Sequence, residues 1–85
     1  MRIGTVKASV WATRKAETLA GQTFLVVDVG SEEIVAADQV GAGKGDRVLL
    51  VTGTPAARFC MDAPVDAVVV AILDANGSGN LNVGA

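Results

Sequence analysis

Apolar and polar residues alternate along several short segments of this chain, and this period of two is typical of half-buried β-strands. The first such segment runs from Ile3 to Thr13. Strict alternation would divide its residues between two faces, with Ile3, Thr5, Lys7 and Ser9 on one and Gly4, Val6, Ala8 and Val10 on the other. Two shorter segments, Glu33 to Asp38 and Arg47 to Thr52, also read as strands.

Two further segments are apolar on both faces, namely Thr23 to Val29 and Val65 to Leu73. A strand of this kind is covered on both sides. We therefore expect each of them to contact the core of its own domain on one face and something else on the other. Between the second and third strands, the sequence GSEE predicts a hairpin turn.

A short helix is predicted between the last two strands, within residues 53–61. Thr54 is a suitable N-cap, and Pro55 occupies the first helical position, where its missing N–H does no harm. Five strands with one small helix predict a mainly all-β fold, a closed or nearly closed OB-like barrel. In the usual OB fold, however, the helix lies between the third and fourth strands. We expect one domain over residues 1–75 and a Gly- and Asn-rich tail over 76–85.

The composition indicates a thin core. The chain has 85 residues, of which 51% are apolar and only 4% aromatic, with 14 Val and 14 Ala. It has one Cys and no His, which argues against an internal disulfide and against a structural zinc site. Oligomerisation is the remaining common way for so small a domain to bury more surface. An ordinary Val-rich β-domain remains the alternative.

Charge is unevenly distributed along the chain. The net charge is −2, yet Arg2, Lys7, Arg14 and Lys15 precede every acidic residue. This asymmetry fits a basic face of one subunit against an acidic face of another, or simply a solvated basic strand. The sequence shows no signal peptide and no apolar run long enough to span a bilayer, so we expect a cytoplasmic protein without a membrane partner.

The densest glycine stretch, Gly41 to Gly45, invites comparison with phosphate-binding loops. A P-loop would require Gly at position 38 and Ser or Thr at position 45, where the chain has Asp38 and Gly45. The dinucleotide-binding pattern fails as well, and the loop precedes a strand rather than a helix. We therefore interpret the loop as architecture that permits close backbone approach, with Asp46 able to pin the turn by an Asx-type bond.

No catalytic constellation is evident. Without His there is no conventional imidazole base, and Cys60 reads as an inert thiol. Asp62 and Asp66 read as solvated or capping carboxylates. The three aromatic residues, Trp11, Phe24 and Phe59, read as core residues in an acidic chain, which argues against nucleic-acid binding. We predict no enzyme activity, cofactor or metal.

Four stretches of the chain, in order and spacing, resemble the EutN/CcmL family of bacterial microcompartment vertex proteins. They are IGTVKASVWATRK, LAGQTFLVV, VAADQVGAGKGDRVLLVTGTPAARF and PVDAVVVAILD. The resemblance implies an OB-like barrel assembled as a homopentamer, which caps the vertices of a shell whose facets are hexameric proteins. Thr54 and Pro55 depart from the small Gly/Ser pair expected before Ala-Ala-Arg.

The resemblance also suggests which residues lie at a subunit junction or near the central axis. The candidates are Gly41, Ala42, Gly43, Lys44, Gly45, Asp46 and Arg58. Two other functions remain open. One is a small OB-type binding module for nucleic acid or a peptide, and the other is an enzyme accessory subunit that holds a ligand at Lys44 and Arg47.

Overall fold

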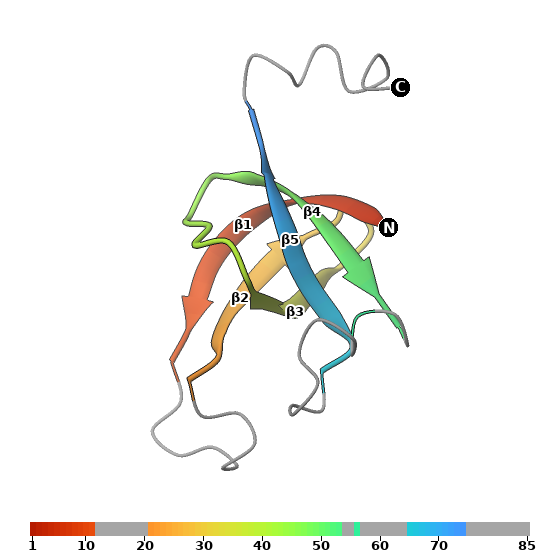
Figure 1. Ribbon diagram of the computed structural model, residues 1–85. Helices are drawn as coiled ribbons and strands as arrows, with labels where there is room; N and C mark the ends of the chain where they lie inside the picture. The colour runs from red at the N-terminus through yellow and green to blue at the C-terminus, as the bar shows by residue number, and fades with distance from the viewer. Residues whose placement is uncertain (12–20, 54–55, 57–64, 75–85) are drawn as a thin grey trace.

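The computed structural model describes residues 1–11, 21–53, 56 and 65–74 of the chain. These residues form five strands that wrap around a single axis (Figure 1). The strands are β1 (Arg2–Val10), β2 (Thr23–Asp28), β3 (Glu33–Asp38), β4 (Arg47–Thr52) and β5 (Ala67–Leu73).

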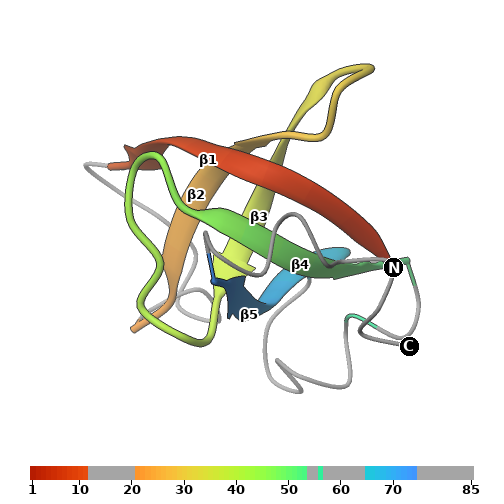
Figure 2. The ribbon, with the colours of Figure 1, turned by 90° about the horizontal axis from the view of Figure 1, so that it is seen from above.

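The strands close into a barrel in the order β1-β2-β3-β5-β4, and β4 returns to pair with β1 (Figure 2). Four of the five seams are antiparallel. The seam between β3 and β5 is parallel and short, with Ala37 opposite Val68 and Asp38 opposite Val69. The first half of β3 therefore separates from β5. The predicted small OB-like barrel is confirmed.

Small aliphatic side chains fill the barrel, as the composition predicts. The interior cluster contains Val6, Leu25, Val27, Ala36, Ala42, Val48, Leu50, Ala67 and Val69. The largest of these side chains are leucines, and no buried polar or charged residue occurs within the described ranges. Such a core gains its stability from close packing rather than from a few large aromatic anchors.

A second apolar cluster lies on the outside of the barrel. Ala37, Val51 and Val68 face outward from three neighbouring strands, yet they are buried together with Ala56. Phe24 and two valines pack against this cluster. The expectation that β5 is covered on both sides is therefore confirmed for its first half. In β2, by contrast, Leu25 and Val27 are buried while Phe24 and Val26 on the other face are only half-buried.

A β-bulge at Lys7 interrupts β1. Val6 lies opposite Val27, whereas Ala8 lies opposite Val26, so Lys7 has no partner of its own on β2. An extra residue in one strand shifts the alternation of all residues that follow it. The predicted face containing Gly4, Val6, Ala8 and Val10 is consequently wrong beyond Val6. Gly4 and Val6 are buried, but every residue from Lys7 to Val10 is exposed.

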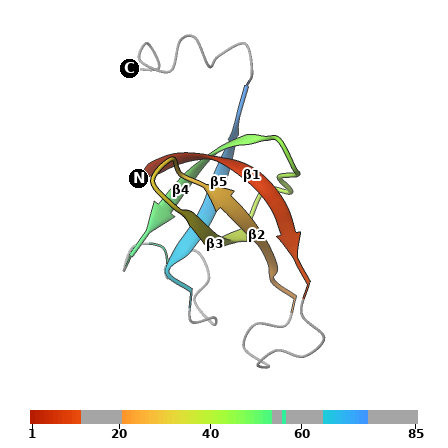
Figure 3. The same ribbon diagram turned by 180° about the vertical axis from the view of Figure 1, so that it is seen from behind.

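Among the other predicted elements, some are confirmed, one strand begins later than predicted, and others lie largely outside the described residues. The bounds of β3 and β4 are as predicted, and β5 begins at Ala67, two residues later than expected. The GSEE turn forms the β2–β3 hairpin (Figure 3): the N–H of Val29 donates to the carbonyl of Glu32 at 3.0 Å, and Gly30 has φ of 96°. The predicted helix over 53–61, except for Gly53 and Ala56, and the tail over 76–85 lie outside the described residues.

Candidate functional site: the glycine loop

The loop from Gln39 to Asp46 carries β3 over to β4 and is attached to the barrel at both of its ends. The N–H of Gln39 donates to the carbonyl of Val69 on β5, at 3.2 Å. At the other end, the N–H of Gly45 donates to the carbonyl of Val6, and the N–H of Val6 donates to the carbonyl of Asp46, both at 2.9 Å. The loop therefore continues the strand pairing of β1 at the point where β4 begins (Figure 1).

Two carboxylates organise the loop from within. One oxygen of Asp38 accepts hydrogen bonds from the N–H groups of Val40, at 3.0 Å, and Gly41, at 3.1 Å. The Oδ2 atom of Asp46 accepts a hydrogen bond from the N–H of Gly43 at 2.9 Å, and the N–H of Asp46 donates back to the carbonyl of Gly43 at 3.0 Å. Asp46 therefore pins the turn, but it does so by reaching back three residues instead of forward as in an Asx turn.

The three glycines of the loop differ in whether their backbone conformation favours glycine. Gly41 and Gly45 have φ of 78° and 90°, in the left-handed region that favours glycine over residues with a Cβ atom. Gly43 does not have a positive φ. A Cβ atom at position 43 would have a single neighbour within 4 Å, the Oδ2 atom of Asp46, at 4.0 Å. The subunit by itself thus does not require glycine at this position.

The structure places the predicted site residues in three different environments. Ala42 turns inward and packs into the interior cluster. Gly41, Gly43, Lys44 and Gly45 are exposed, and Asp46 is half-buried in its hydrogen bonds. Arg58 lies outside the described residues. The loop is therefore a hydrogen-bonded, backbone-rich ridge with an exposed outer surface.

The described part of the chain does not assemble a catalytic or metal-binding constellation. It contains no group of three or more His, Cys, Asp or Glu side chains that could hold a metal ion. No helix among the described residues is long and apolar enough to cross a membrane. Hollows on the described surface include one of about 460 Å³ beside Val35 and Asp66 and another of about 300 Å³ beside Gly4 and Arg47.

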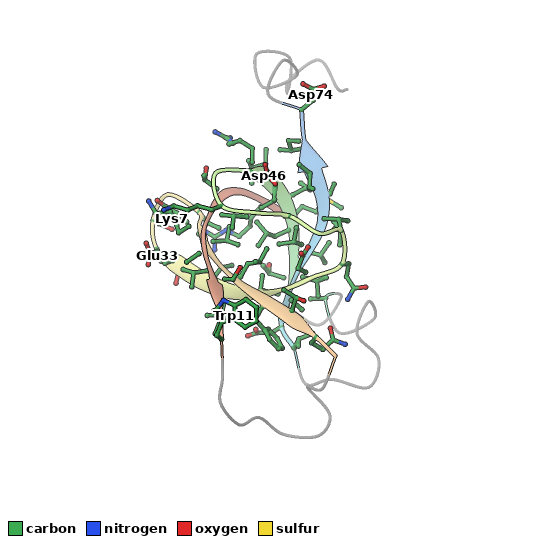
Figure 4. The ribbon with its side chains drawn as sticks, turned by 90° about the vertical axis from the view of Figure 1, so that its left-hand side faces the viewer. Lys7, Trp11, Glu33, Asp46 and Asp74 are labelled. Atoms are coloured by element: carbon green, nitrogen blue, oxygen red, sulfur yellow. The ribbon has the colours of Figure 1, made fainter. Side chains whose placement is uncertain are left out.

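The prediction that Trp11 is a core residue is wrong. Its side chain is 91% exposed at the end of β1, far from Asp74 at the end of β5 (Figure 4). Phe24 does pack against the outer cluster, and Phe59 lies outside the described residues. Every residue of β1 from Lys7 onward is exposed, so Trp11 follows a part of the strand that the interior cluster does not reach.

Comparison with known proteins identifies a matching family and relatives of this chain. Residues 1–74 match the model of the family described as ethanolamine utilisation protein EutN/carboxysome. The carboxysome shell vertex protein CcmL of Synechococcus elongatus is 42% identical over 92 aligned positions, which cover 98% of this chain and 93% of that protein. That relative is a structural shell protein, which confirms the prediction of a non-catalytic protein.

Solved structures agree with the sequence relatives. CcmL of Nostoc sp. superimposes with a TM-score of 0.80 at 36% identity, covering 87% of this chain and 89% of that one. The pentameric microcompartment shell protein GrpN of Rhodospirillum rubrum gives a TM-score of 0.76 at 36% identity, covering 87% of this chain and 94% of that one. With its closed barrel, its glycine loop and these matches, the chain belongs to the EutN/CcmL family of microcompartment shell proteins.

Proposed function

We propose that this protein is a structural component of a bacterial microcompartment shell, where it assembles as a pentamer and caps the vertices. The observation that carries the proposal is the match to shell vertex proteins over nearly the whole chain, in sequence and in fold. Its site of action is then the shell itself, within the cytoplasm. No chemical step is required of it, since its contribution is geometric.

Elementary geometry explains why such a protein is needed. A flat layer of hexagonal tiles cannot close on itself, and units of fivefold symmetry supply the missing curvature. A ring of five identical subunits requires a heterologous interface, in which one face of each subunit contacts a different face of the next. The thin Val- and Ala-rich core fits this reading, because so small a domain gains stability from burying surface against copies of itself.

The glycine loop is the part of the described surface that we propose to lie at a subunit junction or near the fivefold axis. Its shape is fixed within the subunit by the carboxylates of Asp38 and Asp46. Its outward side presents backbone at Gly43, where a neighbour can approach closely. We propose the same location for Arg58, and we assign residues 1–75 to the shell domain and 76–85 to a tail.

The partners that we propose beyond the pentamer are hexameric shell proteins, which would form the facets around each vertex. Co-expression with a hexameric shell protein from the same genome tests this proposal. We expect closed polyhedral particles when both proteins are present, and open sheets or tubes when the hexamer is expressed alone. Particles that close equally well without this protein, as seen by electron microscopy, would contradict the vertex role.

The alternative of an OB-type module for single-stranded nucleic acid has little support from the surface. Such modules stack several bases on aromatic side chains above a basic groove. Trp11 is the only aromatic side chain among the described residues that is mostly exposed, and the chain carries a net charge of −2. The surface therefore fits a protein partner better than a nucleic acid.

A further inference from the structure

The end of β1 is exposed to an unusual degree for a strand in a closed barrel. Lys7, Ala8, Ser9 and Val10 are all exposed, so the strand lacks cover on both of its faces there. Val10 is 38% exposed, and Trp11 directly after it is 91% exposed. A tryptophan side chain presents roughly 150–250 Å² of mostly apolar surface. In the isolated subunit, nearly all of that surface contacts water.

The same stretch also has an unpaired edge. β1 pairs with β4 only from Arg2 to Thr5, and the glycine loop bonds to it at Val6. Beyond Val6, β1 pairs with β2 alone among the described residues. Open strand edges are templates for pairing with another chain. The edge follows directly on the glycine loop, and both lie on one side of the molecule in Figures 1 and 3.

A receptive surface lies at the other end of β1. The hollow of about 460 Å³ is lined by Arg2 at the start of that strand, by Ile34 and Val35 of β3, and by Asp66 and Ala67 at the start of β5. Val35 is 52% exposed there, because the first half of β3 separates from β5.

The hollow combines aliphatic side chains with polar groups, among them Thr52, Asp66 and the guanidinium of Arg2. That guanidinium donates a hydrogen bond to the hydroxyl of Ser31 at 3.2 Å and lies 3.7 Å from a carboxylate oxygen of Glu32, so it is held in place at the rim. Such a lining suits an indole ring, since arginine stacks favourably on aromatic faces and an indole N–H can donate to a polar group.

These observations lead to one assignment. We propose that Trp11 is the anchor of the contact between neighbouring subunits in the ring: Val10 and Trp11 of one copy pack into the Val35 hollow of the next copy. The inference rests on the pentamer proposed above and identifies the two unlike faces that a closed ring requires. The two ends of β1 contribute to these two faces. They lie far enough apart to do so, because the nine residues of β1 span roughly 27 Å at about 3.3 Å per residue.

A second copy of this chain fits the patch better than an unrelated partner does. The patch continues the surface of the glycine loop, which is already the proposed junction. A specific interface buries about 800 Å² on each partner, and a centrally placed tryptophan supplies a large part of that area. Tryptophans at the centre of such contacts are typically the residues that dominate the binding energy.

The fluorescence of Trp11 tests the proposal directly, because it is the only tryptophan in the chain. In the purified wild-type pentamer, we expect blue-shifted emission and poor quenching by acrylamide compared with the unfolded chain. A pentamer by native mass spectrometry whose tryptophan emits and quenches as in the unfolded chain would overturn this inference and leave the vertex function standing. A wild-type protein that forms no pentamer would instead overturn the proposed function, and this inference with it.

Four substitutions, one of them a control, locate the contact. Trp11→Ser and Val35→Arg should each weaken association by roughly 30-fold or more per interface, as expected for loss of an anchor. Trp11→Phe should retain the ring. Ile72→Ser is the matched control, because Ile72 is 45% exposed on β5 but belongs to neither surface. The proposal is overturned if Trp11→Ser assembles like the wild type, or if Ile72→Ser dissociates the ring as strongly as Trp11→Ser does.

Discussion

Single residues show how tightly the barrel is packed, and Gly4 is the clearest case. It is buried in β1, and a Cβ atom at this position would lie 2.5 Å from the Cγ1 atom of Val27 and 2.7 Å from the carbonyl oxygen of Asp28. Neither neighbour can move away easily, because Val27 is fully buried and the oxygen belongs to the backbone of β2. The alternation of the sequence places Gly4 on the same face as Val6, but only the structure shows that this face is inward there and that a Cβ atom does not fit.

We expect Gly4→Ala to lower the free energy of unfolding by about 1–3 kcal/mol, the range that is typical of overpacking in a core. Gly43→Ala is the control, since a Cβ atom there would approach only the Oδ2 atom of Asp46, at 4.0 Å. Urea denaturation of both variants at the same protein concentration measures the difference, because assembly makes apparent stability depend on concentration. Equal midpoints for Gly4→Ala and the wild type would contradict the packing account.

At the scale of elements, the positions of the strands can be predicted from the sequence, but the irregularities within them cannot. The alternating pattern gives β3 and β4 with their observed bounds. Local patterns cannot reveal the bulge at Lys7, because it depends on how β1 aligns with β2, some twenty residues away. The contacts of the glycine loop are non-local as well. The sequence therefore cannot show that Ala42 is buried in the interior cluster or that the N–H of Gly45 donates to the carbonyl of Val6.

The glycine loop yields a prediction of its own. Among the described residues, a Cβ atom at position 43 would meet nothing closer than the Oδ2 atom of Asp46, at 4.0 Å. If the loop lies at the subunit junction, the main clash of a larger side chain is therefore with a neighbouring copy. We expect Gly43→Val to impair the pentamer, as judged by native mass spectrometry, more than it impairs the barrel, as judged by circular dichroism. Gly43→Ala should have a smaller effect on assembly. A wild-type-like pentamer in Gly43→Val would remove the loop from the subunit junction.

At the scale of the whole molecule, closure of the barrel stabilises the subunit, whereas the thinness of its core limits that stability. Closure joins β4 to β1 and so pairs strands that an open sheet would leave at its edges. The core that remains is built mostly from valine and alanine, and small domains of this size are marginally stable alone. Exposed apolar residues at both ends of β1 then offer additional surface to bury. Assembly is thus expected to contribute to folding as well as to function.

The number of subunits in solution tests the central claim most directly. Native mass spectrometry or light scattering of the purified protein at micromolar concentration should give five copies of the 8.6-kDa chain, about 43 kDa in all. That result would agree with the pentameric relative and with a heterologous ring. A stably folded monomer, or a ring with another number of subunits, would contradict the assignment as a shell vertex.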